Sequence, residues 1–179
     1  VQATVLYLAV YLAMTLAAFA VVTARERETG RGDDISALAG LGASRPLLAW
    51  PMTIAMLSLA GIPATAGFVG KFYLIAAAVD GGYTWLSIVI VIGTMISLGY
   101  YLRVVAAMWL SDEPAAAPAS PGAIPAMAGA SPETDSPTGG QPEIVFVAVL
   151  FGAASLLFGI IPSPLFDLAR DAGSALGLL

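Results

Sequence analysis

The 179-residue sequence contains no cysteine and no histidine. These side chains bind most zinc ions, haem irons and iron–sulfur clusters, and histidine is the usual general base of serine hydrolases. The sequence also has no glycine-rich nucleotide-binding motif and no basic cluster of the kind that binds nucleic acid. We therefore expect no redox centre, cofactor or metal ion in this chain, and no nucleic-acid partner.

Charge is also scarce. Only 11% of the residues are charged, 59% are hydrophobic and the mean hydropathy is +0.89. A soluble domain has about 25% charged residues, so a chain this apolar could not cover itself with polar surface. The composition predicts a protein whose natural solvent is the lipid bilayer.

Four hydrophobic segments each reach the roughly 20 apolar residues that a membrane-spanning helix requires. They are residues 1–24, 46–80, 81–110 and 144 to about 166, the last of these within the C-terminal region 143–179. The predicted fold is an all-α, multi-pass membrane protein with four transmembrane segments, the second of them broken. The chain begins inside a hydrophobic segment and lacks the charged start of a secretory signal, so we interpret it as part of a longer protein.

The arginines predict the orientation. Four of the six lie between the first two segments, at positions 25, 27, 31 and 45, whereas the turn at Asp80 has no positive charge. Because positive charge favours the cytoplasmic side, we expect residues 25–45 inside, Asp80 outside and the C-terminus outside. Arg170 is the one charge that argues against this orientation.

Residues 111–142 differ in composition from the rest of the chain. They hold seven of the twelve prolines, with many Ala, Ser and Gly and no aromatic residue. Such a stretch cannot bury enough apolar surface to fold, so we predict a disordered cytoplasmic linker. Two other stretches have the pattern of short interfacial helices. One is the apolar run after Asp33 and Asp34, and the other is the tail 164–179, with Leu165, Leu168 and Ala169 facing lipid.

Lys71 is the only lysine, and it lies deep in the second segment, about 12 Å along a helix from Pro63 and from Asp80. A charge at that depth costs about 2.5–3.5 kcal/mol. Burial destabilises an ammonium ion relative to the neutral amine, which makes proton exchange accessible. The alternative is a structural lysine paired with an acid on another helix. Small residues at helical spacing with it (Ala64, Gly67 and Ala78) indicate that Lys71 faces protein rather than lipid.

Gly61 and Pro63 predict a break in the same segment. Proline has no N–H, so the carbonyl of Leu59 loses its helical partner, and glycine lowers the local helix preference further. Broken helices inside membranes occur where protein or water satisfies the freed backbone groups. The alternative is a simple proline kink.

Two polar stripes run along the first and third segments. The first contains Thr4, Tyr7, Tyr11 and Thr15, and the second contains Thr94, Ser97 and Tyr101. Either stripe could line a hydrated path, and either could equally provide hydrogen bonds between helices.

The run Leu-Ser-Leu-Ala-Gly-Ile-Pro-Ala-Thr-Ala-Gly-Phe-Val-Gly-Lys-Phe-Tyr at residues 57–73 resembles the signature of the antiporter-like membrane subunits of bacterial NADH:quinone oxidoreductase, respiratory complex I. The runs at 7–19 and 100–105 are also similar, and they are most like the subunit N branch. The resemblance implies a fold of inverted repeats, with 46–80 as the broken helix of the second repeat and Lys71 as its proton-carrying lysine.

The resemblance also implies that quinone, NADH, FMN and iron–sulfur clusters belong to other subunits, and that the chain lies in the bacterial inner membrane beside other membrane subunits. A subunit of a related cation/proton antiporter and a structural membrane scaffold are the alternatives. Two positions depart from the family pattern: Ala64 replaces a second proline, and Thr15 stands where asparagine is frequent.

The orientation is testable with single cysteines, because the chain has none of its own. In cells producing the full-length protein, an impermeant thiol reagent added outside should label Gly81→Cys and leave Gly32→Cys unlabelled until the membrane is permeabilised. The opposite pattern would show that the orientation is inverted.

Overall fold

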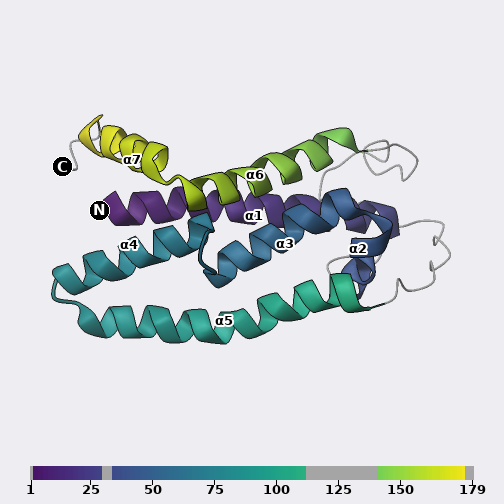
Figure 1. The fold of residues 1–179 in the computed structure, drawn as a ribbon, viewed down its shortest axis with the longest axis horizontal. Helices are drawn as coiled ribbons and strands as arrows, with labels where there is room; N and C mark the ends of the chain where they lie inside the picture. Colours follow the sequence, from purple (N-terminus) through teal and green to yellow (C-terminus); the bar gives the residue numbers. More distant parts are fainter. Residues whose placement is uncertain (1, 30–33, 112–140, 176–179) are drawn as a thin grey trace, which may run out of the picture.

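The computed structural model describes residues 2–29, 34–111 and 141–175, and all regular structure in these ranges is helical (Figure 1). The elements, in chain order, are α1 (Gln2–Thr29), the 3-10 helix η1 (Ile35–Leu38), α2 (Leu41–Ser44), α3 (Pro46–Ala60), α4 (Ala66–Asp80), α5 (Thr84–Leu110), α6 (Pro142–Ile160) and α7 (Ser163–Ala175). The linker predicted at 111–142 falls mostly on residues 112–140, outside the described residues.

Three of the described helices are long and apolar enough to cross a membrane, judged by length and composition: Ala3–Thr29, Thr84–Leu110 and Pro142–Ile160. The segment predicted at 46–80 consists of two 15-residue helices, α3 and α4. Each is about 22 Å long, less than the roughly 30 Å of a bilayer core. Neither half alone could span the bilayer, but the two follow one another along the long axis of the bundle (Figure 1).

Several segment ends differ from the sequence prediction. Helix α1 continues five residues past position 24, to Thr29, because Arg25 at its end is buried and hydrogen-bonded. The last long helix, α6, ends at Ile160 rather than near Phe166. Pro162 explains this early end, because the residue before a proline disfavours helical geometry, and α7 then begins as a separate helix.

The two predicted interfacial stretches are both helical. The Asp34 carboxylate accepts a hydrogen bond from the Ser36 N–H at 3.1 Å and so caps η1. In α7 the prediction for Leu165 was wrong: its side chain is 6% exposed and packs on Leu6, Val10 and Met14 of α1. Leu165 therefore anchors α7 to protein.

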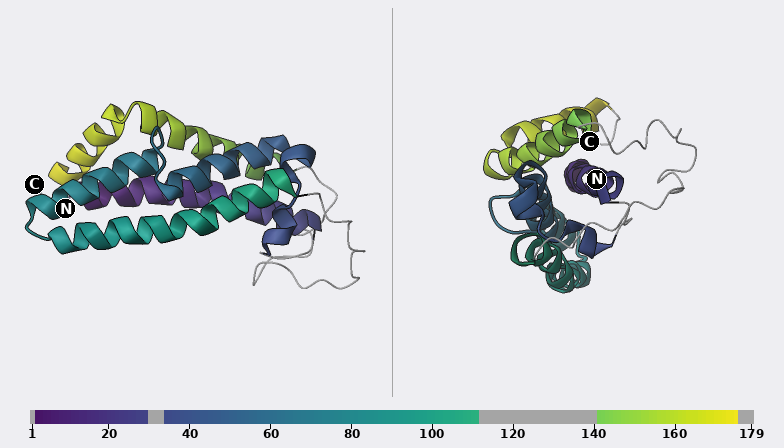
Figure 2. Two further views of the ribbon diagram at one scale, coloured as in Figure 1. Left: turned by 60° about the horizontal axis from the view of Figure 1, so that its bottom comes forward. Right: turned by 90° about the vertical axis from the view of Figure 1, so that its right-hand side faces the viewer.

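Helix α1 packs against α3, α4, α6 and α7 with one face and exposes Leu8, Leu12 and Phe19 on another (Figures 1 and 2). The main core forms from small residues and methionines, which allow close helix contact; it includes Ala17, Val21, Met52, Ala55, Met56, Met108 and Ala148. Helix α5 packs on α3 and α4 and exposes a row of large apolar side chains, among them Ile88, Ile92, Met95 and Ile96. An apolar face of this kind suits lipid or further helices.

A charged network fastens one end of the bundle. The buried Arg25 guanidinium donates to the Ala37 carbonyl at 2.9 Å and to the Glu28 carboxylate at 3.1 Å. Arg45, at the start of α3, reaches the other Glu28 oxygen at 3.2 Å. The Glu28 carboxylate thus joins the end of α1 to the start of α3. Arg25 in turn connects α1 to η1 through its hydrogen bond to the Ala37 carbonyl.

We predict that Glu28→Gln destabilises the full-length protein, because the buried Arg25 loses the Glu28 carboxylate as a charged acceptor. Hydrogen bonds to charged groups contribute about 1.5–3 kcal/mol, so the midpoint of thermal unfolding in detergent should fall. Glu26→Gln is the matched control, because two residues along a helix turn the side chain by about 200° to another face. Equal midpoints for the two variants would contradict a role of the network in stability.

Candidate functional site

The end of α3 is built by Gly61. Its φ of 78° places it in the left-handed region, which glycine adopts without steric cost. Its N–H donates to the Ser58 carbonyl at 2.9 Å, and the Ile62 N–H donates to the Leu57 carbonyl at 3.0 Å. This pair of bonds is the Schellman motif, which satisfies two of the carbonyls at a helix C-terminus. Pro63 follows in the non-helical segment 61–65.

The next carbonyl, that of Leu59, accepts a hydrogen bond from the lysine. Lys71 Nζ donates to the Leu59 oxygen at 2.6 Å across the break. In a continuous helix this oxygen would accept from residue 63, which is proline and has no N–H to give. A Cβ added at Gly61 would lie 3.3 Å from Lys71 Cδ, so the glycine also leaves room for the lysine chain. The sequence-predicted orphan carbonyl and the sequence-predicted lysine are therefore direct partners.

A backbone N–H at the start of α4 is hydrogen-bonded by a buried pair of serine hydroxyls. Its second residue, Gly67, donates its N–H to Ser58 Oγ at 2.9 Å, and Ser155 Oγ of α6 donates to the same oxygen at 2.8 Å. Both serines are almost fully buried. Ser58 thus links the end of α3, the start of α4 and the middle of α6.

Glycines allow these backbones to approach. A Cβ at Gly67 would collide with the Ser58 carbonyl, and one at Gly159 of α6 would collide with the backbone of Ala64 and Thr65. Ala64 itself has a positive φ of 70° and lies in the break. The prediction that Ala64 shares a helical face with Lys71 was therefore wrong, whereas Gly67 lies on α4 as expected.

A cavity of about 260 Å³ lies beside Lys71. It is lined by polar groups from both sides: Tyr7 and Tyr11 of α1, and Thr94, Ser97, Tyr100 and Tyr101 of α5. Tyr100 and Tyr101 contact each other edge-on, with ring centroids 4.6 Å apart. The fold thus brings three residues of the predicted polar path, Thr94, Ser97 and Tyr101, to one cavity with Lys71.

The Thr94 and Ser97 hydroxyls, on the α5 side of the cavity, donate hydrogen bonds to backbone carbonyls of their own helix. Thr94 Oγ1 donates to the Ile90 carbonyl at 2.8 Å, and Ser97 Oγ donates to the Thr94 carbonyl at 2.9 Å. Each hydroxyl oxygen keeps lone pairs that can accept a proton donor from the cavity. Thr15, the remaining residue of the predicted path, is not among the lining residues.

Sequence reasoning missed Ser58 and Ser155, the hydroxyl pair at the break. The available signal was a single serine within each of two strongly apolar helices, α3 and α6. In the part of the chain that the structure describes, no group of three or more Asp, Glu, His or Cys side chains could hold a metal ion. The polar side chains gathered at this site are one amine and a set of hydroxyls, which can donate and accept hydrogen bonds.

The fold and its satisfied internal break define an all-helical membrane protein of several passes. Residues 1–97 match the family described as NADH:quinone oxidoreductase/Mrp antiporter, transmembrane, and the chain belongs to this family.

A curated relative from Paramagnetospirillum magneticum, NADH-quinone oxidoreductase subunit N, is 35% identical over 176 residues, which are 98% of this chain and 32% of that protein. The chain spans between 24% and 33% of the length of the curated relatives that it matches.

Two solved structures share the fold. A chain of respiratory complex I from Thermus thermophilus with bound aureothin gives a TM-score of 0.68 at 26% identity, over 93% of this chain and 34% of that one. A chain of the Mrp complex from Dietzia sp. DQ12-45-1b gives 0.71 at 24% identity, over 94% and 36% respectively.

We predict that Ser58→Ala destabilises the full-length protein more than Ser155→Ala. The first variant removes the acceptor of a buried N–H, and an unsatisfied buried donor costs about 1–3 kcal/mol. The second variant removes only a donor to an oxygen that keeps its bond from Gly67. Midpoints of thermal unfolding in detergent measure the difference, and a larger loss in Ser155→Ala would refute this account of the break.

Proposed function

We propose that this chain is part of an antiporter-like, proton-translocating membrane subunit of NADH:quinone oxidoreductase. The observation that carries the proposal is the lysine at the helix break, which is held by a backbone carbonyl on one side and on the other borders a cavity that several hydroxyl groups help to line. Relatives that are 35–48% identical and named NADH-quinone oxidoreductase subunit N support the choice of complex.

In this proposal α3 and α4 together form one membrane-crossing segment, which gives four segments in all. The pair is the broken helix of the second of two inverted repeats, and the first repeat belongs to the remainder of a longer protein. The linker at 111–142 lies in the cytoplasm, and the C-terminus lies outside the bacterial inner membrane.

Lys71 would exchange its proton between two positions. When charged, its ammonium group donates to the Leu59 oxygen, at the C-terminal end of α3 where the helix dipole favours positive charge. When neutral, the amine loses most of that attraction and is free to turn toward the cavity. Lys71 is the sixth residue of α4, beyond the first turn where the opposing dipole of that helix would act.

The cavity would supply the next stage of the path. Thr94, Ser97 and Tyr101 are the hydroxyl groups that we assign to it, with Tyr7 and Tyr11 on the facing wall. A hydroxyl can both donate and accept a hydrogen bond, so a few such groups and intervening water can pass a proton without any of them remaining charged.

The energy would come from other subunits of the complex, which would hold quinone, NADH, FMN and the iron–sulfur clusters. This chain would contribute no redox chemistry and would respond to movement or charge transmitted through its membrane neighbours.

A subunit of a multi-subunit cation/proton antiporter is the second candidate, because the similarity to a chain of the Mrp complex supports the same fold. Both candidates use Lys71 in the same way. They differ in partners: co-purification of the full-length protein with NADH-oxidising subunits favours complex I, and a complex without them favours an antiporter.

We predict that Lys71→Ala lowers proton pumping per assembled complex, because alanine keeps the helix and removes the exchangeable site. Because the Leu59 carbonyl also loses its donor, the amount of assembled protein should fall as well. Lys71→Arg should also be impaired, since arginine keeps the charge but is effectively never deprotonated in proteins. The measurement is proton uptake and NADH-driven quinone reduction in membranes that contain matched amounts of each variant.

Phe72→Ala is the control, because it truncates a neighbouring side chain that is 60% exposed, and it should pump normally. A structural scaffold predicts that all three variants pump equally. Full pumping by Lys71→Ala would exclude the relay, and full pumping by Lys71→Arg alone would reduce Lys71 to a fixed charge.

A further inference from the structure

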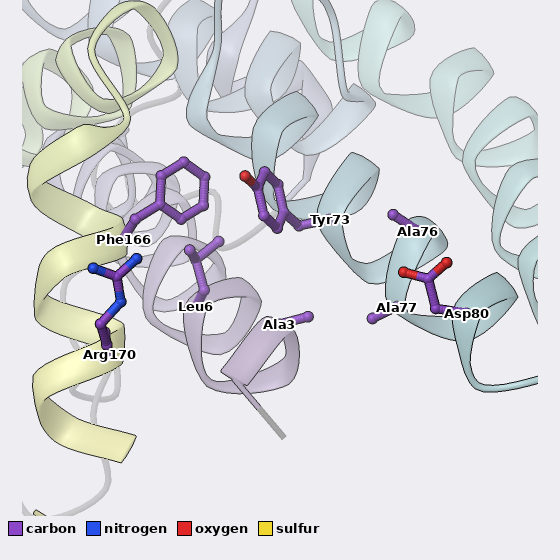
Figure 3. Close-up of a pocket in the computed structure, with 8 residues that line it drawn as sticks. All are labelled: Ala3, Leu6, Tyr73, Ala76, Ala77, Asp80, Phe166 and Arg170. Carbon is purple, nitrogen blue, oxygen red and sulfur yellow. The ribbon is translucent and has the colours of Figure 1, made fainter. Parts of the chain in front are cut away.

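Helix α4 presents different residues to its two sets of neighbours. Figure 3 shows Tyr73, Ala76 and Asp80 of α4 along a second cavity, whose other walls belong to α1 and α7. Lys71 instead lines the cavity that α4 shares with α5. Ile75 follows Lys71 by four residues, about one helical turn, and so lies on the same side of α4 as the lysine. The face of α4 that meets α5 is therefore the face that carries Lys71.

Ser87 joins α5 to this face of α4. Its hydroxyl group donates to the Ile75 carbonyl at 3.1 Å, and the residue is buried. A carbonyl oxygen inside a helix keeps a second lone pair for such a donor. In the part of the chain that the structure describes, no other hydrogen bond joins the body of α5 to that of α4. The short turn at residues 81–83 and this one bond therefore fix how the two helices lie against each other.

The polar wall of the Lys71 cavity depends on the same alignment. Thr94 is seven residues from Ser87, which returns it to the same face of α5 to within about 20°. Thr94 also lies close to the lysine, because a Cβ added at Gly61 would be 3.5 Å from Lys71 Nζ and 3.7 Å from Thr94 Cγ2. The hydroxyl groups of Thr94 and Ser97 donate within α5. Neither of these bonds holds α5 against α4, so the position of this wall depends on contacts elsewhere along the helix.

Apolar packing alone would align these two helices weakly. The four residues of α4 after Ile75 are three alanines and a valine, and most side chains in the first half of α5 are exposed. Rotation of α5 about its own axis would carry Thr94 away from Lys71, by about 100° for a change of one residue position. A single buried polar group can specify how packed helices align, and hydrogen bonds of this kind join helices in membranes. Ser87 is placed to do this for α4 and α5.

We propose that Ser87 is a positioning residue for the proton transfer assigned to Lys71. Through its bond to the Ile75 carbonyl it holds α5 so that Thr94 and, about one turn further on, Ser97 face the lysine. Ser87 carries no proton along the path, since it is not among the residues that line the cavity. This inference rests on the proposed function of Lys71 and extends it to the helix that faces the lysine.

The test compares Ser87→Ala with Ser87→Thr in the full-length protein within its complex. Ser87→Ala removes the bond, so proton pumping per assembled complex should fall about two- to tenfold, the range that corresponds to one hydrogen bond between uncharged groups. Ser87→Thr keeps a hydroxyl group and should restore most of the pumping. Thr84→Ala is the matched control, because it removes an exposed hydroxyl group three residues earlier on the same helix, and it should pump like the wild type. Normal pumping by Ser87→Ala, or no recovery in Ser87→Thr, would overturn the proposal.

A double variant separates positioning from stability. If Ser87 acts through Thr94, the loss of pumping in the double variant Ser87→Ala, Thr94→Ala should be smaller than the product of the two single losses, because one change removes a group that the other has already displaced. Losses that multiply would contradict this coupling, and so would fewer assembled complexes at unchanged pumping per complex, the result of a purely structural role. Impaired Lys71→Ala beside normal Ser87→Ala would reject this inference alone, whereas full pumping by Lys71→Ala would reject the proposed function.

Discussion

The carbonyl oxygen of Leu59 lacks its usual helical hydrogen-bond donor, and much of the structure around the helix break depends on how this oxygen is satisfied. The residue that would donate to it in a continuous helix is Pro63, which has no N–H, and a bare carbonyl in hydrocarbon costs several kcal/mol. The chain supplies a donor from its single lysine, 12 residues further on. This one hydrogen bond satisfies the broken end of α3 and gives the Lys71 ammonium group an acceptor inside the bundle.

The break then dictates how closely the neighbouring helices pack. For Lys71 to reach back to Leu59, the start of α4 must pass beside the end of α3, and this is possible because Gly67 has no Cβ to collide with the Ser58 carbonyl. The same approach lets Ser58 accept from the Gly67 N–H and from Ser155. Gly159 of α6 lies against the backbone of Ala64 and Thr65 in the break, where a Cβ would collide. The contacts of the break therefore also position α6, a helix distant in sequence.

Much of this was predictable, because single residues carry strong constraints inside a membrane. The long apolar helices, the break after α3 and the orphan carbonyl at Leu59 follow from residue type and spacing. The partner of Lys71 did not follow, because the alternative considered was an acid on another helix, whereas the structure uses a backbone oxygen on the same segment. Ala64, Leu165 and the serine pair depend on tertiary packing, which periodicity does not encode. Thr15 shares a stripe with Tyr7 and Tyr11, yet it does not line the cavity that they border.

The energies at Lys71 bear on the proton exchange that we propose for it. Placing its charge at this depth costs about 2.5–3.5 kcal/mol. A hydrogen bond from a charged donor returns about 1.5–3 kcal/mol, and the C-terminal dipole of α3 returns about 0.3–1 kcal/mol more. These contributions offset most of the cost of burying the charge. An acidic partner at the same distance would instead fix the ammonium form, because a full opposite charge at low dielectric attracts far more strongly than a carbonyl. In the proposed relay, a backbone oxygen holds the lysine in position and opposes loss of its proton less than a carboxylate would.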